Sequence, residues 1–249
     1  MAGHSKFKNI MHRKGAQDKK RAKLFSRLIR EISVASKIGG SDQDSNPRLR
    51  TAINNALSSN MSKENIQRAI KKNTSNSEVE QIHEIIYEGF GPNGVAVIIE
   101  SLTDNKNRSA SEIRSTFSKY NGNLGISGSV KHNFHKVGVI LYSKEIDNFE
   151  NFFEFCASLD VKDIIENEES YDVITEPEYF HQIIFNLEKK YSVAKFSSIE
   201  WRPINKIDIE DEECAKRLVD LLERLEDLDD VQSVVANFNI NDDLMEKII

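Results

Sequence analysis

The chain has 249 residues, of which 39% are hydrophobic and 30% charged, with 11 Gly and only 4 Pro. This composition is typical of a globular protein of two or three domains and excludes a disordered chain or a fibrous repeat. No stretch approaches the ~20 apolar residues that span a bilayer, and the polar first residues lack the apolar core of a secretory signal. We therefore expect a cytoplasmic protein without a membrane segment. The only cysteines, Cys156 and Cys214, predict neither a disulfide framework nor a zinc site.

Charge is divided unequally along the chain. Residues 1–72 contain 17 Lys and Arg against 5 Asp and Glu, a net charge of +12, whereas residues 73–249 carry −18. Such asymmetry indicates a polyanion as the partner of the basic part.

The pattern of residues in the basic part predicts three short amphipathic helices that share one small core. Apolar residues recur with a period of 3.6 between residues 16 and 38, and Gly39-Gly40 ends that helix. Asn46 and Pro47 start a second helix, and Ser62 starts a third. The apolar faces are expected to consist of Leu24, Phe25, Leu28, Ile29, Ile32 and Ala35 in the first helix, Leu49, Ala52, Ile53, Ala56 and Leu57 in the second, and Ile66, Ala69 and Ile70 in the third.

Beyond a polar linker at residues 73–80, strands and helices alternate. Two strands are expected at 82–88 and 95–102, followed by a helix opened by a capping box at Ser109–Glu112. From residue 137 to 202 the order is β-α-β-β-α-β, the ferredoxin-like order, with a second capping box at Thr175–Glu178. Residues 205–240 then offer a short strand, a helix and a strand.

These elements predict a multidomain α+β fold: an N-terminal three-helix domain plus two ferredoxin-like α+β domains, one inserted in the other. The expected boundaries are a basic helical domain at 1–80, a discontinuous α+β domain at 81–133 and 205–249, and an inserted ferredoxin-like domain at 134–204. The alternative is two sequential domains with a C-terminal appendage.

One face of the first helix carries the strongest functional signal. At 100° per residue, Lys19, Lys23, Arg27 and Arg30 fall within about 80° of one another, opposite the apolar stripe. Regularly placed cations suit the phosphates of a nucleic-acid backbone. A flexible basic arm at residues 4–14 could follow a groove or a single strand. The alternative interpretation is a solvated charged face, but only Asp18 and Glu31 offer local compensation.

Motifs that resemble enzyme sites fail on their context. Gly89–Gly94 matches a dinucleotide-binding pattern but leads into a strand and contains a proline, so we expect a turn. His132 and His135 lack a further ligand pair. The acidic stretch 208–230 is expected to be a solvated helix face, or else to repel nucleic acid or touch the basic domain. We expect no enzyme activity, no catalytic residue, no metal site and no cofactor.

Several motifs resemble those of the YebC/PmpR family over the whole chain. They are Met1-Ala2-Gly3-His4-Ser5-Lys6, His12-Arg13-Lys14, Asn46-Pro47-Arg48-Leu49-Arg50, Tyr87-Glu88-Gly89, Thr103-Asp104-Asn105 with Asn107-Arg108, and Gly122-Asn123-Leu124-Gly125. Phe7 stands where the family commonly has Trp. The resemblance implies three domains, one α+β domain inserted in another. It also implies a cytoplasmic DNA-binding protein that regulates transcription. A mitochondrial relative instead activates translation of a cytochrome oxidase subunit, and bacterial relatives are linked to the ribosome.

We therefore expect a monomeric, DNA-binding transcriptional regulator that acts through phosphate contacts. An RNA- or ribosome-associated translation factor using the same surface is the alternative, and components of the transcription or translation machinery are the expected protein partners. The candidate nucleic-acid contacts are His4, Lys6, His12, Arg13, Lys14, Lys19, Lys20, Lys23, Arg27, Arg30, Arg48 and Arg50.

Overall fold

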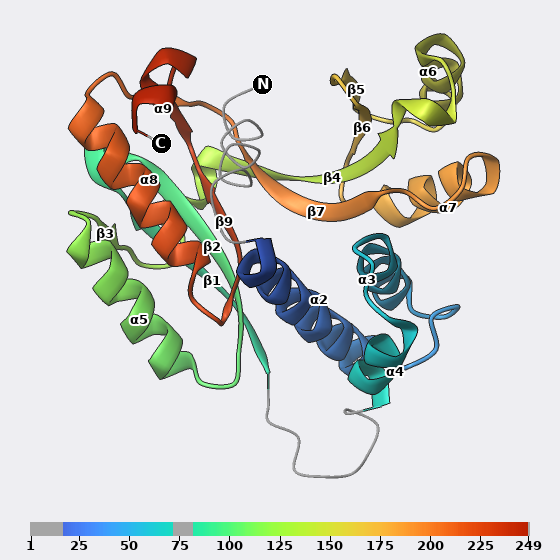
Figure 1. Ribbon diagram of the computed structural model, residues 1–249, viewed down its shortest axis with the longest axis horizontal. Helices are drawn as coiled ribbons and strands as arrows, with labels where there is room; N and C mark the ends of the chain where they lie inside the picture. Colours follow the sequence, from blue (N-terminus) through green and yellow to red (C-terminus); the bar gives the residue numbers. More distant parts are fainter. Residues whose placement is uncertain (1–16, 72–81, 249) are drawn as a thin grey trace. The chain divides into compact units, whose positions relative to one another are not determined.

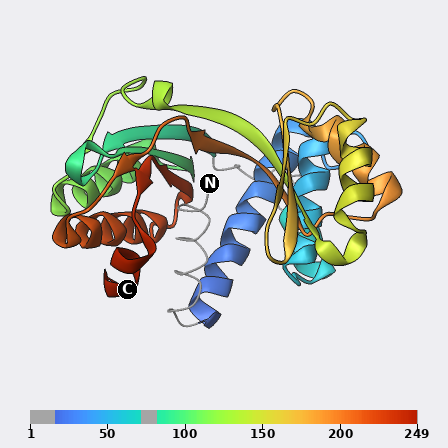
Figure 2. The same cartoon turned by 90° about the horizontal axis from the view of Figure 1, so that it is seen from above.

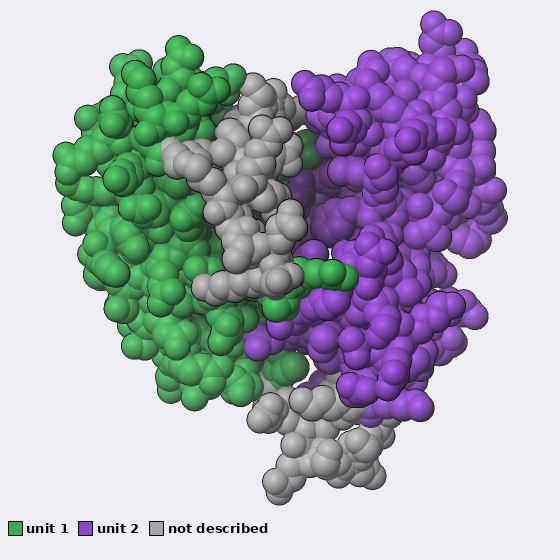
Figure 3. All heavy atoms as spheres, viewed as in Figure 1, with its two compact units in different colours: residues 1–23, 80–135, 201–249 green, residues 24–79, 136–200 purple. Residues whose placement is uncertain are grey.

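The computed structural model describes residues 17–71 and 82–248. The chain divides into two compact units, which Figure 3 shows in different colours. Unit 1 comprises residues 1–23, 80–135 and 201–249, and unit 2 comprises residues 24–79 and 136–200.

The three expected helices of the basic part are present, and their shared core is confirmed (Figure 1). They are α2 (Gln17–Gly39), α3 (Pro47–Ser58) and α4 (Lys63–Lys71). The Asn46 side chain accepts the Leu49 N–H at 3.1 Å, and Ser62 Oγ accepts the Asn65 N–H at 3.3 Å, so both predicted caps are correct. The core joins residues of all three helices, with Ile32, Leu49 and Ala56 fully buried.

Unit 2 also contains a four-stranded sheet with the predicted ferredoxin-like order. Its strands stand in the order β5-β6-β4-β7, and β6 runs antiparallel to both β4 and β5. Numbered along the chain, this is the arrangement 2-3-1-4 of a β-α-β-β-α-β unit. The elements are β4 (Phe134–Ser143), α6 (Phe149–Ala157), β5 (Asp163–Glu166), β6 (Ser170–Thr175), α7 (Phe180–Lys190) and β7 (Phe196–Pro203).

The sheet of unit 1 has the order β3-β1-β2-β9 and is antiparallel throughout. Numbered along the chain, its order is 3-1-2-4 and not the 2-3-1-4 of the other sheet, because the strand beside the short edge strand β3 comes first in the chain instead of third. Helices α5 and α8 lie on one side of this sheet, as Figure 2 shows. The elements are β1 (His83–Phe90), β2 (Ala96–Thr103), α5 (Lys106–Lys119), β3 (Asn123–Leu124), α8 (Glu212–Glu226) and β9 (Val231–Ala236).

Smaller elements complete the described residues. Strands β8 (Ile207–Asp208) and β10 (Phe238–Asn239) form a parallel pair, and α9 (Asp242–Ile248) follows. Single 3₁₀ turns occur at Pro92–Gly94, Lys131–Asn133 and Lys144–Ile146. Residues 134–203 form one sheet between the two stretches of chain that build the other. The expected three-domain division, with its boundaries, stays a prediction.

Both predicted capping boxes are wrong. Helix α5 starts three residues before Ser109, because the Asn105 side chain accepts the Arg108 N–H at 3.1 Å and caps the helix there. Thr175 is the last residue of β6, where it pairs with Gly138, and α7 begins only at Phe180. In each case the hydroxyl is buried, so it cannot serve an exposed helix start.

Candidate nucleic-acid interface

Helix α2 has an apolar side and a basic side over its middle turns. Leu28, Ile32 and Ala35 are buried against α3 and α4, as expected. Arg27 and Arg30 are half-buried, and both lie about 100° or more around the helix from Leu28. The helix therefore directs these cations away from the core that holds it.

The basic face of α2 is interrupted after Arg30. Ile32 to Ala35, together with Ser36, are five consecutive buried residues, and five consecutive positions cover every side of a helix. Leu24 and Ile29, which we expected on the apolar stripe, are 42% and 36% exposed instead. Leu28, which lies between them in sequence, belongs to the core, and Phe25 packs against it, so the periodic pattern includes positions that the core does not bury.

The structure describes only part of the predicted contact set. His4, Lys6, His12, Arg13 and Lys14 lie outside the described residues, and Lys19 and Lys20 are described only as backbone of α2. Lys23, in unit 1, donates through Nζ to Asp227 Oδ1 at 2.8 Å. The acidic stretch thus supplies a partner to one cation of the predicted face.

Arg48 forms an ion pair that the sequence did not predict. Its Nε and one terminal nitrogen donate to the two carboxylate oxygens of Glu31, at 2.6 and 3.0 Å. This two-pronged geometry is the strongest form of an Arg–carboxylate pair, and it ties α3 to α2. Seventeen residues separate the partners, so no local pattern could predict the contact.

Arg50 faces α7 of the same unit. Desolvation by burial lowers the pKa of His181, and the positive charge of Arg50 lowers it further. Burial also raises the pKa of Glu188, although Arg50 and a 3.0 Å bond from Asn54 Nδ2 both oppose this shift. Arg50 therefore acts electrostatically on two groups of the ferredoxin-like part.

Asn55 makes the closest polar contact between α3 and that part of unit 2. Its amide nitrogen donates to the Ser197 carbonyl at 2.7 Å, and its amide oxygen accepts the Ser197 N–H at 3.0 Å. Both residues are buried. The side chain thus satisfies both backbone groups of one residue of β7, as a neighbouring strand would.

Exposed cations on α4 were missing from the predicted set. Lys63, Arg68 and Lys71 are exposed, and Arg68 contacts Glu64 at 2.9 Å in an i,i+4 pair. They belong to the +12 charge of residues 1–72, but this short helix offers too few turns to define a face from periodicity alone.

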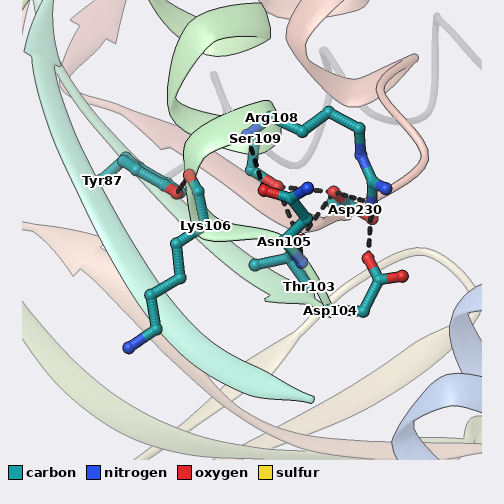
Figure 4. A network of polar contacts seen from close by, with 8 residues as sticks. All are labelled: Tyr87, Thr103, Asp104, Asn105, Lys106, Arg108, Ser109 and Asp230. Atoms are coloured by element: carbon teal, nitrogen blue, oxygen red, sulfur yellow. Dashed lines mark hydrogen bonds and ion pairs between the residues drawn. The ribbon is translucent and has the colours of Figure 1, made fainter. Parts of the chain in front are cut away.

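In unit 1, the motif Thr103–Arg108 surrounds a buried aspartate (Figure 4). Arg108 bridges Asp104 and Asp230 at 2.7 and 2.9 Å, while the Thr103 and Ser109 hydroxyls also contact Asp230. Burial opposes ionisation of Asp230, but hydrogen bonds from Ser109, Arg108 and Thr103 prevail and lower its pKa. The network fixes the turn from β2 into α5 to the start of β9, and the acidic stretch therefore includes a residue that is no part of a solvated face.

Glu88 holds the chain after β3 in the same way. Its carboxylate accepts the N–H groups of Gly128, Val130 and Lys131 at 2.7, 2.8 and 2.9 Å. Burial disfavours the charged form, yet these three donors hold the pKa of Glu88 below its usual value. The buried charge is thereby satisfied by three backbone groups, and the positive charge of Lys131 lowers the pKa further.

The described residues also bear on the glycine-rich motif, on metal ligation and on membrane spanning. Gly91–Gly94 forms a turn between β1 and β2, as expected, with Asn93 at φ 58°. Within residues 17–71 and 82–248, no three His, Cys, Asp or Glu side chains gather as a metal site requires. None of the helices in this part of the chain is both long and apolar enough to cross a bilayer.

A basic helical segment followed by two four-stranded sheets, one of them with the ferredoxin-like order, defines a class of multidomain α+β protein. Two family models match this chain. The model of the TACO1/YebC N-terminal domain matches residues 5–76, and the model of the TACO1/YebC second and third domain matches residues 82–238. The chain belongs to the TACO1/YebC family.

Named relatives are similar over their full length. A "probable transcriptional regulatory protein" of Rickettsia bellii is 49% identical over 99% of this chain and 97% of its own. One of Geobacter sulfurreducens is 47% identical over 100% of both chains. The crystal structure of a conserved hypothetical protein from Aquifex aeolicus has a TM-score of 0.81 and 45% identity, covering 90% of this chain and 92% of that one.

Proposed function

We propose that this protein is a DNA-binding regulator of transcription that holds DNA through phosphate contacts from its basic N-terminal helices. The observation that carries the proposal is the net charge of +12 in residues 1–72, set against −18 in the rest of the chain. Helix α2 directs Arg27 and Arg30 away from the helical core, which suits a backbone of regularly spaced phosphates. The names of the relatives support the regulatory role.

This mode of binding should tolerate many sequences. Arg, Asn and Gln are the side chains that commonly read base edges in the major groove. On α3, Arg48 is bound to Glu31, and Asn54 and Asn55 are bound to Glu188 and Ser197. These side chains hold the fold, so contacts to phosphates supply most of the affinity in this proposal.

The proposal includes a monomeric, cytoplasmic protein that acts by binding, without a cofactor or turnover of its own. The net negative charge of residues 73–249 would limit nucleic-acid contact by repulsion. The same part of the chain would offer surfaces to protein partners from the transcription machinery. RNA or a ribosome as the ligand is the alternative outcome of the tests, because RNA presents the same phosphate charge.

The salt dependence of affinity tests the proposed surface. If the chain neutralises roughly 5–8 phosphates of duplex DNA, the slope of log K against log salt should be about −4 to −7. Reversing Lys19, Lys23 and Arg27 together to Glu should flatten the slope and weaken binding to every sequence alike. The matched control reverses Lys106, Arg114 and Lys216, three exposed cations of α5 and α8. An equal change in both triple variants, or none in either, would contradict the assignment.

A further inference from the structure

Two segments of unit 1 cross the side of its sheet that lies away from α5 and α8. Val130, Phe134 and Trp201 form a buried cluster with Ile98 of β2 and Val235 of β9. Neighbouring positions such as Val97 and Val234 point to the other side, into the core beneath the two helices. Figure 2 shows the yellow-green chain after β3 on the opposite side of the sheet from these helices.

The two sides of this sheet differ in charge. Residues 208–230, which include α8, contain 11 acidic and 3 basic residues. The crossing segments, 126–133 and 201–206, contain no acidic residue and carry Lys131, His132, Arg202 and Lys206. A basic surface is therefore maintained inside the part of the chain whose net charge is −18.

Three acidic side chains of β1 and β2 share this side of the sheet. Two of them accept hydrogen bonds from other groups, and the third lies further along β1. Glu88 is held by the three backbone N–H groups described above. Glu100 accepts from Trp201 Nε1 at 3.1 Å and from Ser233 Oγ at 2.9 Å. Glu84 lies four residues before Glu88 along β1, or about 13 Å along an extended strand. None of these contacts neutralises Lys206.

The backbones that carry the two lysines are fixed. The Lys131 N–H is bound to Glu88, and its Nζ lies 5.6 Å from the centre of the Trp201 ring. The Ile204 N–H donates to the Asn133 carbonyl, and the Lys195 N–H donates to the Leu141 carbonyl, both at 2.9 Å. These two bonds show that β4 and β7 run antiparallel, so the chain just before β4, which carries Lys131, and the chain just after β7, which carries Lys206, leave the same end of this strand pair.

We propose that Lys131, His132 and Lys206 form a second phosphate-contacting surface for nucleic acid, built on unit 1 from residues outside the basic helices. This inference rests on the proposed function, because it takes the same ligand class, a nucleic-acid phosphate backbone. Lys131 and His132 are exposed beside a buried aromatic ring, and Lys206 is exposed on the neighbouring segment. Rigid presentation lowers the entropic cost of ordering these cations on a ligand.

The test uses the full chain with Lys131→Gln and Lys206→Gln. Its control is Lys106→Gln with Lys216→Gln, which removes the same charge from α5 and α8 on the other side of the sheet. Affinity for a duplex DNA and for a single-stranded RNA is measured over a range of salt. Two lost phosphate contacts should reduce the slope by about 1.8 on duplex DNA and about 1.4 on RNA, while the control keeps the wild-type slope.

The outcomes separate this inference from the proposed function. If the wild-type chain binds and both double variants keep its slope, or both lose it equally, the second surface is refuted and the basic helices stand. If the wild-type chain binds neither polymer, the proposed function and this inference fall together. A change on only one polymer identifies the source of the phosphates. Should Lys131→Gln unfold the chain in a melting experiment, Lys206→Gln alone must reduce the DNA slope by about 0.9.

Discussion

Glu88 illustrates how one buried carboxylate can fix a stretch of irregular chain. Three backbone N–H groups from residues 128–131 converge on it, and Gly128 adopts a φ of 85° that favours glycine. The same segment presents Lys131. Replacing Glu88 should therefore affect both the stability of the fold and the basic surface that this segment carries.

Replacing Glu88 by Ala should lower the free energy of unfolding by about 3 kcal/mol, because it leaves one buried and two part-buried donors without an acceptor. Glu84→Ala, at an exposed position of the same strand, should change it by less than about 0.5 kcal/mol. Urea unfolding measures both values. Similar values for the two variants would show that the hydrogen bonds to Glu88 contribute nothing to stability.

The sign of the pH dependence follows from the depressed pKa of Glu88. Its contribution to stability is complete above the pKa of the unfolded carboxyl and is lost as pH falls through the lower folded value. The wild-type chain should therefore lose stability below about pH 4.5. Glu88→Ala should lose less over the same range, which urea unfolding at several pH values can detect.

At the scale of elements, Asn46 links the end of one helix to the start of the next. Its side chain caps α3 and donates to the carbonyls of Ala35 and Gly40, both at 2.8 Å. A Cβ on Gly39 would approach Asn46 Nδ2 to 2.6 Å, so a glycine allows the close approach. The sequence predicted the cap, but it could not predict the two carbonyl partners, which depend on the path of the turn.

Asn46→Ala should cost about 2–3 kcal/mol, because it removes the cap and the donor to a buried Ala35 carbonyl and a part-buried Gly40 carbonyl. Ser45→Ala removes a hydroxyl that bonds only to exposed Asp42, and it should cost under about 1 kcal/mol. Thermal unfolding followed by circular dichroism compares the two. An equal loss in both would contradict the role assigned to Asn46.

Periodicity predicted the helices and the ferredoxin-like order because burial on one side imposes a regular pattern. Periodicity and local motifs failed where a side chain contacts residues that are distant in the sequence. Thr175 and Ser109 match capping boxes in sequence, yet one completes a strand and the other reaches Asp230. Of the candidate site, charge predicted the basic helix, but the engagement of Arg48 with Glu31 depends on how α2 and α3 meet.

At the scale of the whole molecule, Asn55 connects the basic helices to the ferredoxin-like part of unit 2. The reciprocal bonds with Ser197 bury both partners, so the helical segment does not depend on its own small core alone. This connection explains how a few short helices can present a strongly self-repelling set of cations.

Asn55→Ala should lower the stability of unit 2 by about 2–3 kcal/mol, since the Ser197 N–H and carbonyl are left buried and unpaired. It should also increase hydrogen exchange in α3 and α4. Asn54→Ala, whose bond to Glu188 is only half-buried, should have a smaller effect of about 1 kcal/mol. If exchange in α3 and α4 is unchanged in Asn55→Ala, the helices are stable without this connection.

DNA is the proposed ligand of the basic helices. Crosslinking in cells, followed by sequencing of both the bound DNA and the bound RNA, tests this claim most directly. For the wild-type chain we expect DNA from many sequences, and the Lys19, Lys23 and Arg27 reversal should remove it, while the Lys106, Arg114 and Lys216 reversal should retain it. Recovery of RNA without DNA from the wild-type chain would contradict the account and identify a translation factor instead.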